Sequence, residues 1–119
     1  MHEKKYKWYK IAEAMTELQF AENNILQVEV AAKNICIVKT LKGLAACAAK
    51  CPHAGGNMAA GFLDKSENII CPVHRYAFSF ADGRDVTGEG YYLKIYPVQL
   101  NETGIFLGIE ETGFFSWLK

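Results

Sequence analysis

The sequence lacks an excess of charge of either sign. Thirteen Lys and Arg side chains balance thirteen Asp and Glu side chains in 119 residues, so the formal net charge is zero. Binding to nucleic acid or to an anionic membrane surface usually depends on a surplus of basic side chains. We therefore expect neither nucleic acid nor membrane among the partners of this chain.

Long hydrophobic runs and nucleotide-binding glycine patterns are also missing. No stretch reaches the roughly 20 apolar residues of a membrane-spanning helix, and the lysines of the first ten residues are not followed by the apolar run of a signal peptide. The sequence contains no Gly-x-Gly-x-x-Gly turn for a dinucleotide. These absences predict a cytoplasmic protein without a dinucleotide-binding site.

Histidine and cysteine are scarce, yet they are concentrated in two short segments. Of three histidines and four cysteines, two of each form Cys51-x-His53 and, seventeen residues later, Cys71-x-x-His74. Two thiolates and two imidazoles are the ligand set of a 2Fe-2S centre in which histidines replace cysteines on one iron. The order of the residues lets each segment give one sulfur to the first iron and one nitrogen to the second.

Two simpler explanations compete with this interpretation. Four Cys and His ligands can hold structural zinc, but zinc ribbons favour paired Cys-x-x-Cys or His-x-x-x-His spacings, which are absent here. Alternatively, the histidines are surface residues and the cysteines are core residues, which would require four coincidences. Cys36 and Cys47, which stand in apolar segments, are expected to be buried thiols of the core without a disulfide.

The hydrophobic pattern predicts strands almost throughout. Alternation with period two marks 7–11 and 25–30, and a turn at Lys33-Asn34 leads into an apolar strand up to Thr40. A single helical turn is expected at 14–18. Residues 1–119 are therefore expected to form one all-β domain, in which a cluster-binding subdomain of about 45–85 is carried on antiparallel sheets that form a small, partly closed barrel.

The chain resembles the Rieske iron-sulfur family over most of its length. The resemblance includes both ligand segments and the residues around them, namely Gly55-Gly56, 57–61, 74–78, the turn Asp82-Gly83-Arg84, and the strands 93–98 and 104–108. By this resemblance, Cys51 and Cys71 hold the buried iron of a 2Fe-2S cluster, while His53 and His74 hold the outer iron. Gly55, Gly56 and Gly61 either bring backbone amides close to the cluster sulfurs or serve as ordinary turn residues.

Departures from the family pattern predict a low redox potential. Respiratory members have an additional cysteine in each loop, and the matching positions here are Gly56 and Val73, which cannot form that disulfide. Their Ser and Tyr hydroxyl donors correspond to Tyr76 and Phe78. With fewer hydrogen bonds to the cluster, the midpoint should lie toward the low end of the Rieske range of roughly −150 to +300 mV. The covering loop at 86–91 has no proline, which predicts a less rigid cover.

The resemblance implies an electron carrier rather than an enzyme with its own substrate site. Rieske oxygenases hold a mononuclear iron with two histidines and a carboxylate, but only His2 is available outside the ligand segments. We expect a Rieske-type ferredoxin that passes electrons from a ferredoxin reductase to a terminal oxygenase. The alternative is the small subunit of an NADH-dependent nitrite reductase, with the large subunit as its partner.

The exposed edges of the ligand histidines are expected to form the docking surface. The partner should cover His53, His74 and the neighbouring tips near Ala54, Asn57, Met58 and Arg75. Because local charges are balanced, recognition should depend on shape, apolar contact and a few charges. The apolar tail at 114–118 is a competing patch that either packs on the barrel or forms a subunit contact.

Overall fold

The structure, a computed structural model, describes residues 5–53 and 55–111. Strands account for nearly all regular structure in these residues, and two single turns of 3-10 helix, η1 and η2, complete it. The elements are β1 (Tyr6–Ala12), η1 (Met15–Glu17), β2 (Ile25–Val30), β3 (Lys33–Thr40), β4 (Gly43–Ala48), η2 (Met58–Ala60), β5 (Phe62–Leu63), β6 (Ile69–Ile70), β7 (Ala77–Phe78), β8 (Ile95–Tyr96), β9 (Val98–Asn101) and β10 (Gly104–Glu110). The apolar tail at 114–118 and Ala54 lie outside the described residues.

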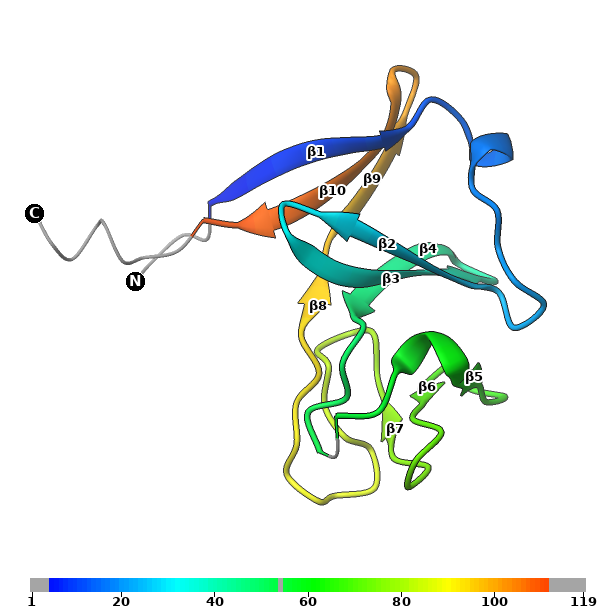
Figure 1. Ribbon diagram of the computed structural model, residues 1–119, viewed down its shortest axis with the longest axis vertical. Coiled ribbons are helices and arrows are strands. Elements are labelled where there is room, and N and C mark those ends of the chain that lie inside the picture. The colour runs from blue at the N-terminus through cyan, green and yellow to red at the C-terminus, as the bar shows by residue number, and fades with distance from the viewer. Residues whose placement is uncertain (1–4, 54, 112–119) are drawn as a thin grey trace, which may run out of the picture.

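Three antiparallel sheets make up the molecule, with the strand orders β1-β10-β9, β2-β3-β4-β8 and β5-β6-β7 (Figure 1). The predicted all-β fold with antiparallel sheets is confirmed. In the described part of the chain the two larger sheets face each other without joining into a closed barrel. The third sheet is small and lies below them in Figure 1.

The sheet β2-β3-β4-β8 is the middle layer, and β3 shows why. Ile35 and Ile37 point into a core shared with β10, where Leu107 and Ile109 are buried. Cys36 and Val38 point to the opposite face of β3. They pack into a second core, which is formed with the segments around the candidate ligands. A strand covered on both faces needs apolar residues at consecutive positions, which explains the run 35–38.

The hairpin between β2 and β3 turns two residues earlier than predicted. Ala31 and Ala32 form the two-residue connection, with φ of 53° and 65°, and Lys33 pairs with Val30 as the first residue of β3. Two positive φ angles are what a type I′ turn requires, and Asn and Gly are the usual residues there. Because Ala-Ala carries no such signal, the more polar Lys33-Asn34 was the wrong choice for the turn.

The candidate ligand segments lie at one end of the molecule. They follow β4 and β6, whose ends face the lower edge in Figure 1, opposite the β9–β10 turn.

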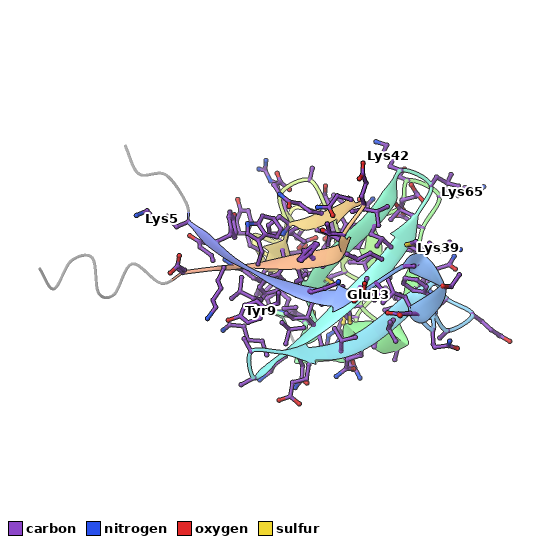
Figure 2. The ribbon with its side chains drawn as sticks, turned by 90° about the horizontal axis from the view of Figure 1, so that it is seen from above. Lys5, Tyr9, Glu13, Lys39, Lys42 and Lys65 are labelled. Carbon is purple, nitrogen blue, oxygen red and sulfur yellow. The ribbon has the colours of Figure 1, made fainter. Side chains whose placement is uncertain are left out.

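At the side of the molecule, the backbone N–H of Leu41 donates to the Glu67 carboxylate at 2.7 Å and ties the β3–β4 turn to the small sheet. Seen from above, Lys39, Lys42 and Lys65 gather on this same side (Figure 2). None of the helices in the described ranges is long and apolar enough to cross a membrane.

Candidate metal centre

The two candidate ligand loops have the same backbone hydrogen-bond pattern. In the first, the N–H of Cys51 donates to the carbonyl of Gly56 at 2.8 Å, and its carbonyl accepts from Gly55 N–H at 3.0 Å. In the second, Cys71 makes the corresponding bonds with Tyr76 and Arg75, both at 2.9 Å. Each loop therefore closes on its own cysteine, and the sequence repeat Cys-Pro becomes a structural repeat.

The fourth residue after each cysteine has a left-handed backbone. Gly55 has φ of 70° and Arg75 has φ of 60°. A left-handed residue at this position lets the chain reverse within five residues, which closes the loop on its cysteine. Gly adopts such a φ freely, whereas Arg does so at a cost in conformational free energy.

Both candidate thiolate ligands are buried beneath the loops. Cys51 and Cys71 are 2% and 1% exposed and share a core cluster with Met58 and Phe78. Gly56 lies directly against the second of them, because a Cβ atom built on it would stand 3.0 Å from the Cys71 sulfur. The sulfur side of the site is thus closed to water, as the resemblance implies for the inner iron.

The two candidate imidazole ligands converge on each other. The Nδ1 atoms of His53 and His74 are 3.2 Å apart. Two nitrogens on one tetrahedral metal ion, with bonds of about 2.0–2.1 Å, would be separated by about 3.3–3.4 Å. The same distance allows a hydrogen bond between the rings, but in either case both Nδ1 atoms point to one place. The residues therefore fit a metal with two histidine ligands.

The described side chains do not form a site for a single metal ion with three or four protein ligands. Across 5–53 and 55–111, no three His, Cys, Asp or Glu side chains converge where they could hold a single metal ion. A mononuclear zinc site uses three or four protein ligands on one ion. A Rieske-type cluster instead takes two cysteines on one iron and two histidines on the other.

Aromatic side chains surround His53 but not His74. The Tyr76 ring stacks on His53 with centroids 4.2 Å apart and planes at 25°, and the Tyr91 ring meets it edge-on at 4.9 Å. His53 is half-buried and His74 is exposed. Partial burial, followed by the negative charge of Glu89, raises the pKa of the Tyr76 phenol. No local sequence pattern indicated these contacts, because they join residues of three separate loops.

The third loop is organised around Asp85, which is only 2% exposed. Its carboxylate accepts hydrogen bonds from the backbone N–H groups of Thr87 and Glu89 at 2.9 and 3.2 Å and from the Thr87 hydroxyl. The Asp85 N–H donates to the carbonyl of Tyr91 at 3.0 Å. The loop thus has internal bracing without proline, and the prediction of a loose cover based on the missing proline overlooked this aspartate.

The structure also gives the roles of two glycines and of Met58 near the candidate ligands. The N–H of Gly61 donates to the Met58 carbonyl, and a Cβ on Gly61 would meet the Ile70 carbonyl oxygen at 2.1 Å, so this glycine serves local packing. Gly55 likewise uses its N–H within the loop. Met58 is fully buried where η2 packs on the core, so its place on the docking surface was a wrong prediction.

The remaining cysteines are buried and stand apart from the ligand pattern. Cys36 and Cys47 face each other across β3 and β4, both fully buried and both free thiols. The hydrogen bond that the Cys47 thiol donates to Cys36 raises the pKa of Cys47, and burial raises it further. The expectation of small buried core residues is confirmed.

Comparison with known proteins identifies a family. The model of the Rieske 2Fe-2S domain matches residues 7–97, which include all four candidate ligands. The cholesterol 7-desaturase nvd of Bombyx mori is 26% identical over 113 residues. This match covers 89% of the present chain but only 24% of the desaturase, so the chain spans about a quarter of the length of that curated relative.

Solved structures share the fold. A protein from Mycobacterium tuberculosis, described as the small subunit of an NADH-dependent nitrite reductase, superposes with a TM-score of 0.75 at 18% identity and covers 90% of this chain and 98% of its own. The ferredoxin of carbazole 1,9a-dioxygenase from Nocardioides aromaticivorans IC177 gives a TM-score of 0.69 at 18% identity and covers 86% and 98%. At these identities the likeness concerns the fold alone.

Proposed function

The chain belongs to the Rieske 2Fe-2S domain family, and from this premise we propose that it passes single electrons from a ferredoxin reductase to a terminal oxygenase. The family's cofactor is a 2Fe-2S cluster, which when bound gains and loses one electron at a time. The carbazole dioxygenase ferredoxin, with the same fold over most of its length, supports the oxygenase as the electron acceptor.

Cys51 and Cys71 would hold one iron, and His53 and His74 would hold the other. The observation that carries this assignment is the convergence of the two Nδ1 atoms, 3.2 Å apart, in loops whose two cysteines are buried. The cysteines place their iron in the dry interior, while the histidines lie between that interior and solvent. The chain's own contribution is to hold four ligands in two braced loops and to exclude water from the sulfur side.

Residues 1–119 would form a single Rieske domain in which about 45–85 bind the cluster. The two cores support this division, because one lies between the larger sheets and the other beneath the ligand loops. The domain would have no substrate site of its own, since His2 is the one histidine outside the ligand loops. We propose that the protein is located in the cytoplasm, where reducing conditions would keep Cys36 and Cys47 as thiols.

Metal analysis and spectroscopy test the assignment. The purified protein should contain two irons and two labile sulfides per chain, and after reduction with dithionite it should give the EPR spectrum of a cluster with histidine on one iron. His53→Ala or His74→Ala should lose or degrade the cluster, because each imidazole fills a ligand position. A colourless protein with one zinc per chain would contradict the proposal.

The small subunit of a nitrite reductase is the second candidate function. It is favoured by the fold comparison with the Mycobacterium tuberculosis protein, which spans nearly the full length of both chains. The two functions differ in their partners, because a nitrite reductase subunit would remain bound to a large sirohaem protein. Stable copurification with such a protein would favour the subunit, whereas purification of a separate carrier that a reductase reduces would favour the ferredoxin.

A further inference from the structure

The two ligand loops share one backbone pattern, but their histidines have different surroundings. His53 has the Tyr76 ring on its face at 4.2 Å and the Tyr91 ring at its edge at 4.9 Å, and the two tyrosine rings are 5.7 Å apart. His74 meets the His53 ring at 4.8 Å, and its distance to Tyr76 is 6.4 Å. One histidine is enclosed by aromatic rings and the other is open on its outer side.

Each tyrosine is held by backbone hydrogen bonds of its own loop. The carbonyl of Tyr76 accepts from the Cys71 N–H at 2.9 Å, which closes the second ligand loop. The carbonyl of Tyr91 accepts from the N–H of the buried Asp85 at 3.0 Å, which closes the third loop. These bonds fix the backbone positions from which the two rings project toward His53. With one ring on the face and the other at the edge of the imidazole, the rings restrict its rotation.

Solvent access follows the same asymmetry. His53 is half-buried, whereas His74 is exposed, and so are the three residues that flank it, Pro72, Val73 and Arg75. Val73 is an apolar side chain that is 51% exposed. A flat protein surface can therefore approach the outer edge of His74, while the phenol rings stand beside that of His53. Electron transfer between proteins requires close approach, so the more accessible ligand offers the shorter route.

We propose that Tyr76 and Tyr91 clamp His53 as positioning residues, and that the redox partner exchanges electrons with the centre through His74. This inference rests on the proposed electron-carrier function and specifies which ligand faces the partner. One electron passes between the bound cluster and the partner, so that one is oxidised as the other is reduced, and no bond forms or breaks.

The experiment compares the reactivity of the two histidines in the iron-loaded, full-length protein. Diethyl pyrocarbonate modifies accessible imidazole nitrogens, and peptide mass mapping reports the rate at each histidine separately. His74 should react several-fold faster than His53. In Tyr76→Leu and Tyr91→Leu, His53 should react faster while His74 stays unchanged, and the EPR lines should broaden because the His53 ring is less fixed. Tyr76→Phe and Tyr91→Phe, which keep the rings, should retain the wild-type pattern.

A second measurement joins the reactivity to electron transfer. Oxidised, iron-loaded protein is modified for increasing times, freed of reagent, reduced with dithionite and desalted to remove the excess, and then mixed with cytochrome c, whose reduction is followed by absorbance. The rate should fall in step with modification of His74. Equal reactivity of the two histidines in the loaded wild-type protein, or a rate that follows His53, would overturn the inference. Such a result would leave the proposed function intact, which fails instead if the wild-type chain binds no iron and sulfide.

Discussion

Side chains around the two buried cysteines set the polarity at the sulfur side of the centre. Phe78 is fully buried in the same core cluster as Cys51 and Cys71, together with Met58. None of the fully buried residues of this cluster carries a hydroxyl group that could donate a hydrogen bond to a sulfur, whereas the Tyr76 and Tyr91 phenols pack against it from the side of His53. Fewer donors favour the oxidised form of an iron-sulfur cluster, so we predict a midpoint potential at pH 7 that is negative or near zero.

Replacing Phe78 by Tyr should raise that midpoint. A new hydroxyl donor beside the sulfurs stabilises the more negative, reduced state, and a hydrogen bond worth about 0.5–1.5 kcal/mol corresponds to roughly 20–65 mV for one electron. Redox titration followed by EPR measures the change. Phe78→Leu adds no donor and serves as the control. A wild-type midpoint near the respiratory high end, or an unchanged midpoint in a loaded Phe78→Tyr protein, would refute the argument.

The candidate ligand residues could be named from the sequence, but their surroundings could not. Cys51, His53, Cys71 and His74 carry a spacing that local chemistry can interpret. The stacking of Tyr76 on His53 depends on how two loops fold against each other, and no spacing rule reports it. Burial of an individual loop residue is equally invisible, which is why Met58 was placed on the surface when it belongs to the core.

At the scale of loops and strands, positions 56 and 73 bring the two ligand loops together. A Cβ atom on Gly56 would lie 3.4 Å from the Cβ of Val73, close to the range of about 3.5–4.5 Å found in disulfides. The same atom would also lie 2.5 Å from a methyl carbon of Val73. Replacement of the valine therefore removes the obstruction and supplies the second sulfur at once.

Gly56→Cys combined with Val73→Cys should form a disulfide between the loops. The bridge closes a segment of 18 residues, for which the chain-entropy model gives a stabilisation of about 3 kcal/mol. Intact mass under oxidising conditions detects the bond, and denaturation with and without reductant measures its effect on the free energy of unfolding. The single variant Gly56→Cys provides the control. If the double variant keeps six free thiols after oxidation, the two loops do not meet as described.

Replacing Asp85 should open the third loop. Its carboxylate accepts several hydrogen bonds while almost fully buried, and hydrogen bonds to a charged group contribute about 1.5–3 kcal/mol each. We expect Asp85→Ala to lower the free energy of unfolding by at least the contribution of one such bond and to increase proteolysis near Gly88. Asp85→Asn keeps one acceptor oxygen, so its stability should lie between those of the wild type and Asp85→Ala. Wild-type stability in Asp85→Ala would show that the loop is held by other contacts.

Regular strands were predictable because each has one or two apolar faces, as in β1, β2 and β3. The connections were harder. Ala31 and Ala32 adopt positive φ angles without the Asn or Gly that normally marks such a turn, and tertiary packing of the two strands overrides the local preference. The pairing of β1 with β10, from opposite ends of the described chain, likewise has no local sequence signal.

At the scale of the whole molecule, charge is balanced overall and uneven locally. Lys39, Lys42 and Lys65 lie together on the side of the β3–β4 turn (Figure 2), while Arg75 is the exposed cation next to His74. A net charge of zero provides little long-range steering. The charge that lies beside the exposed ligand should therefore influence docking more than the distant lysines do.

Arg75→Glu should slow reduction by the cognate reductase, because it reverses the charge at the docking edge. Lys65→Glu makes the same change in net charge on the side of the molecule and is the matched control. Stopped-flow reduction at low and high salt measures both, and the effect of Arg75→Glu should shrink as salt screens it. If Lys65→Glu slows the reaction as much as Arg75→Glu, the partner does not dock at the histidine end.

The left-handed residue that ends each ligand loop has a wider consequence. Gly55 adopts this backbone without strain, but at Arg75 a side chain stands where the conformation costs about 1–2 kcal/mol. Glycine would relieve that strain, although its freedom in the unfolded chain offsets part of the gain. Selection for durability alone would favour glycine in both loops. The second loop instead keeps a cation at its tip. A change from arginine to glycine at this position should therefore raise thermal stability and weaken recognition of the partner.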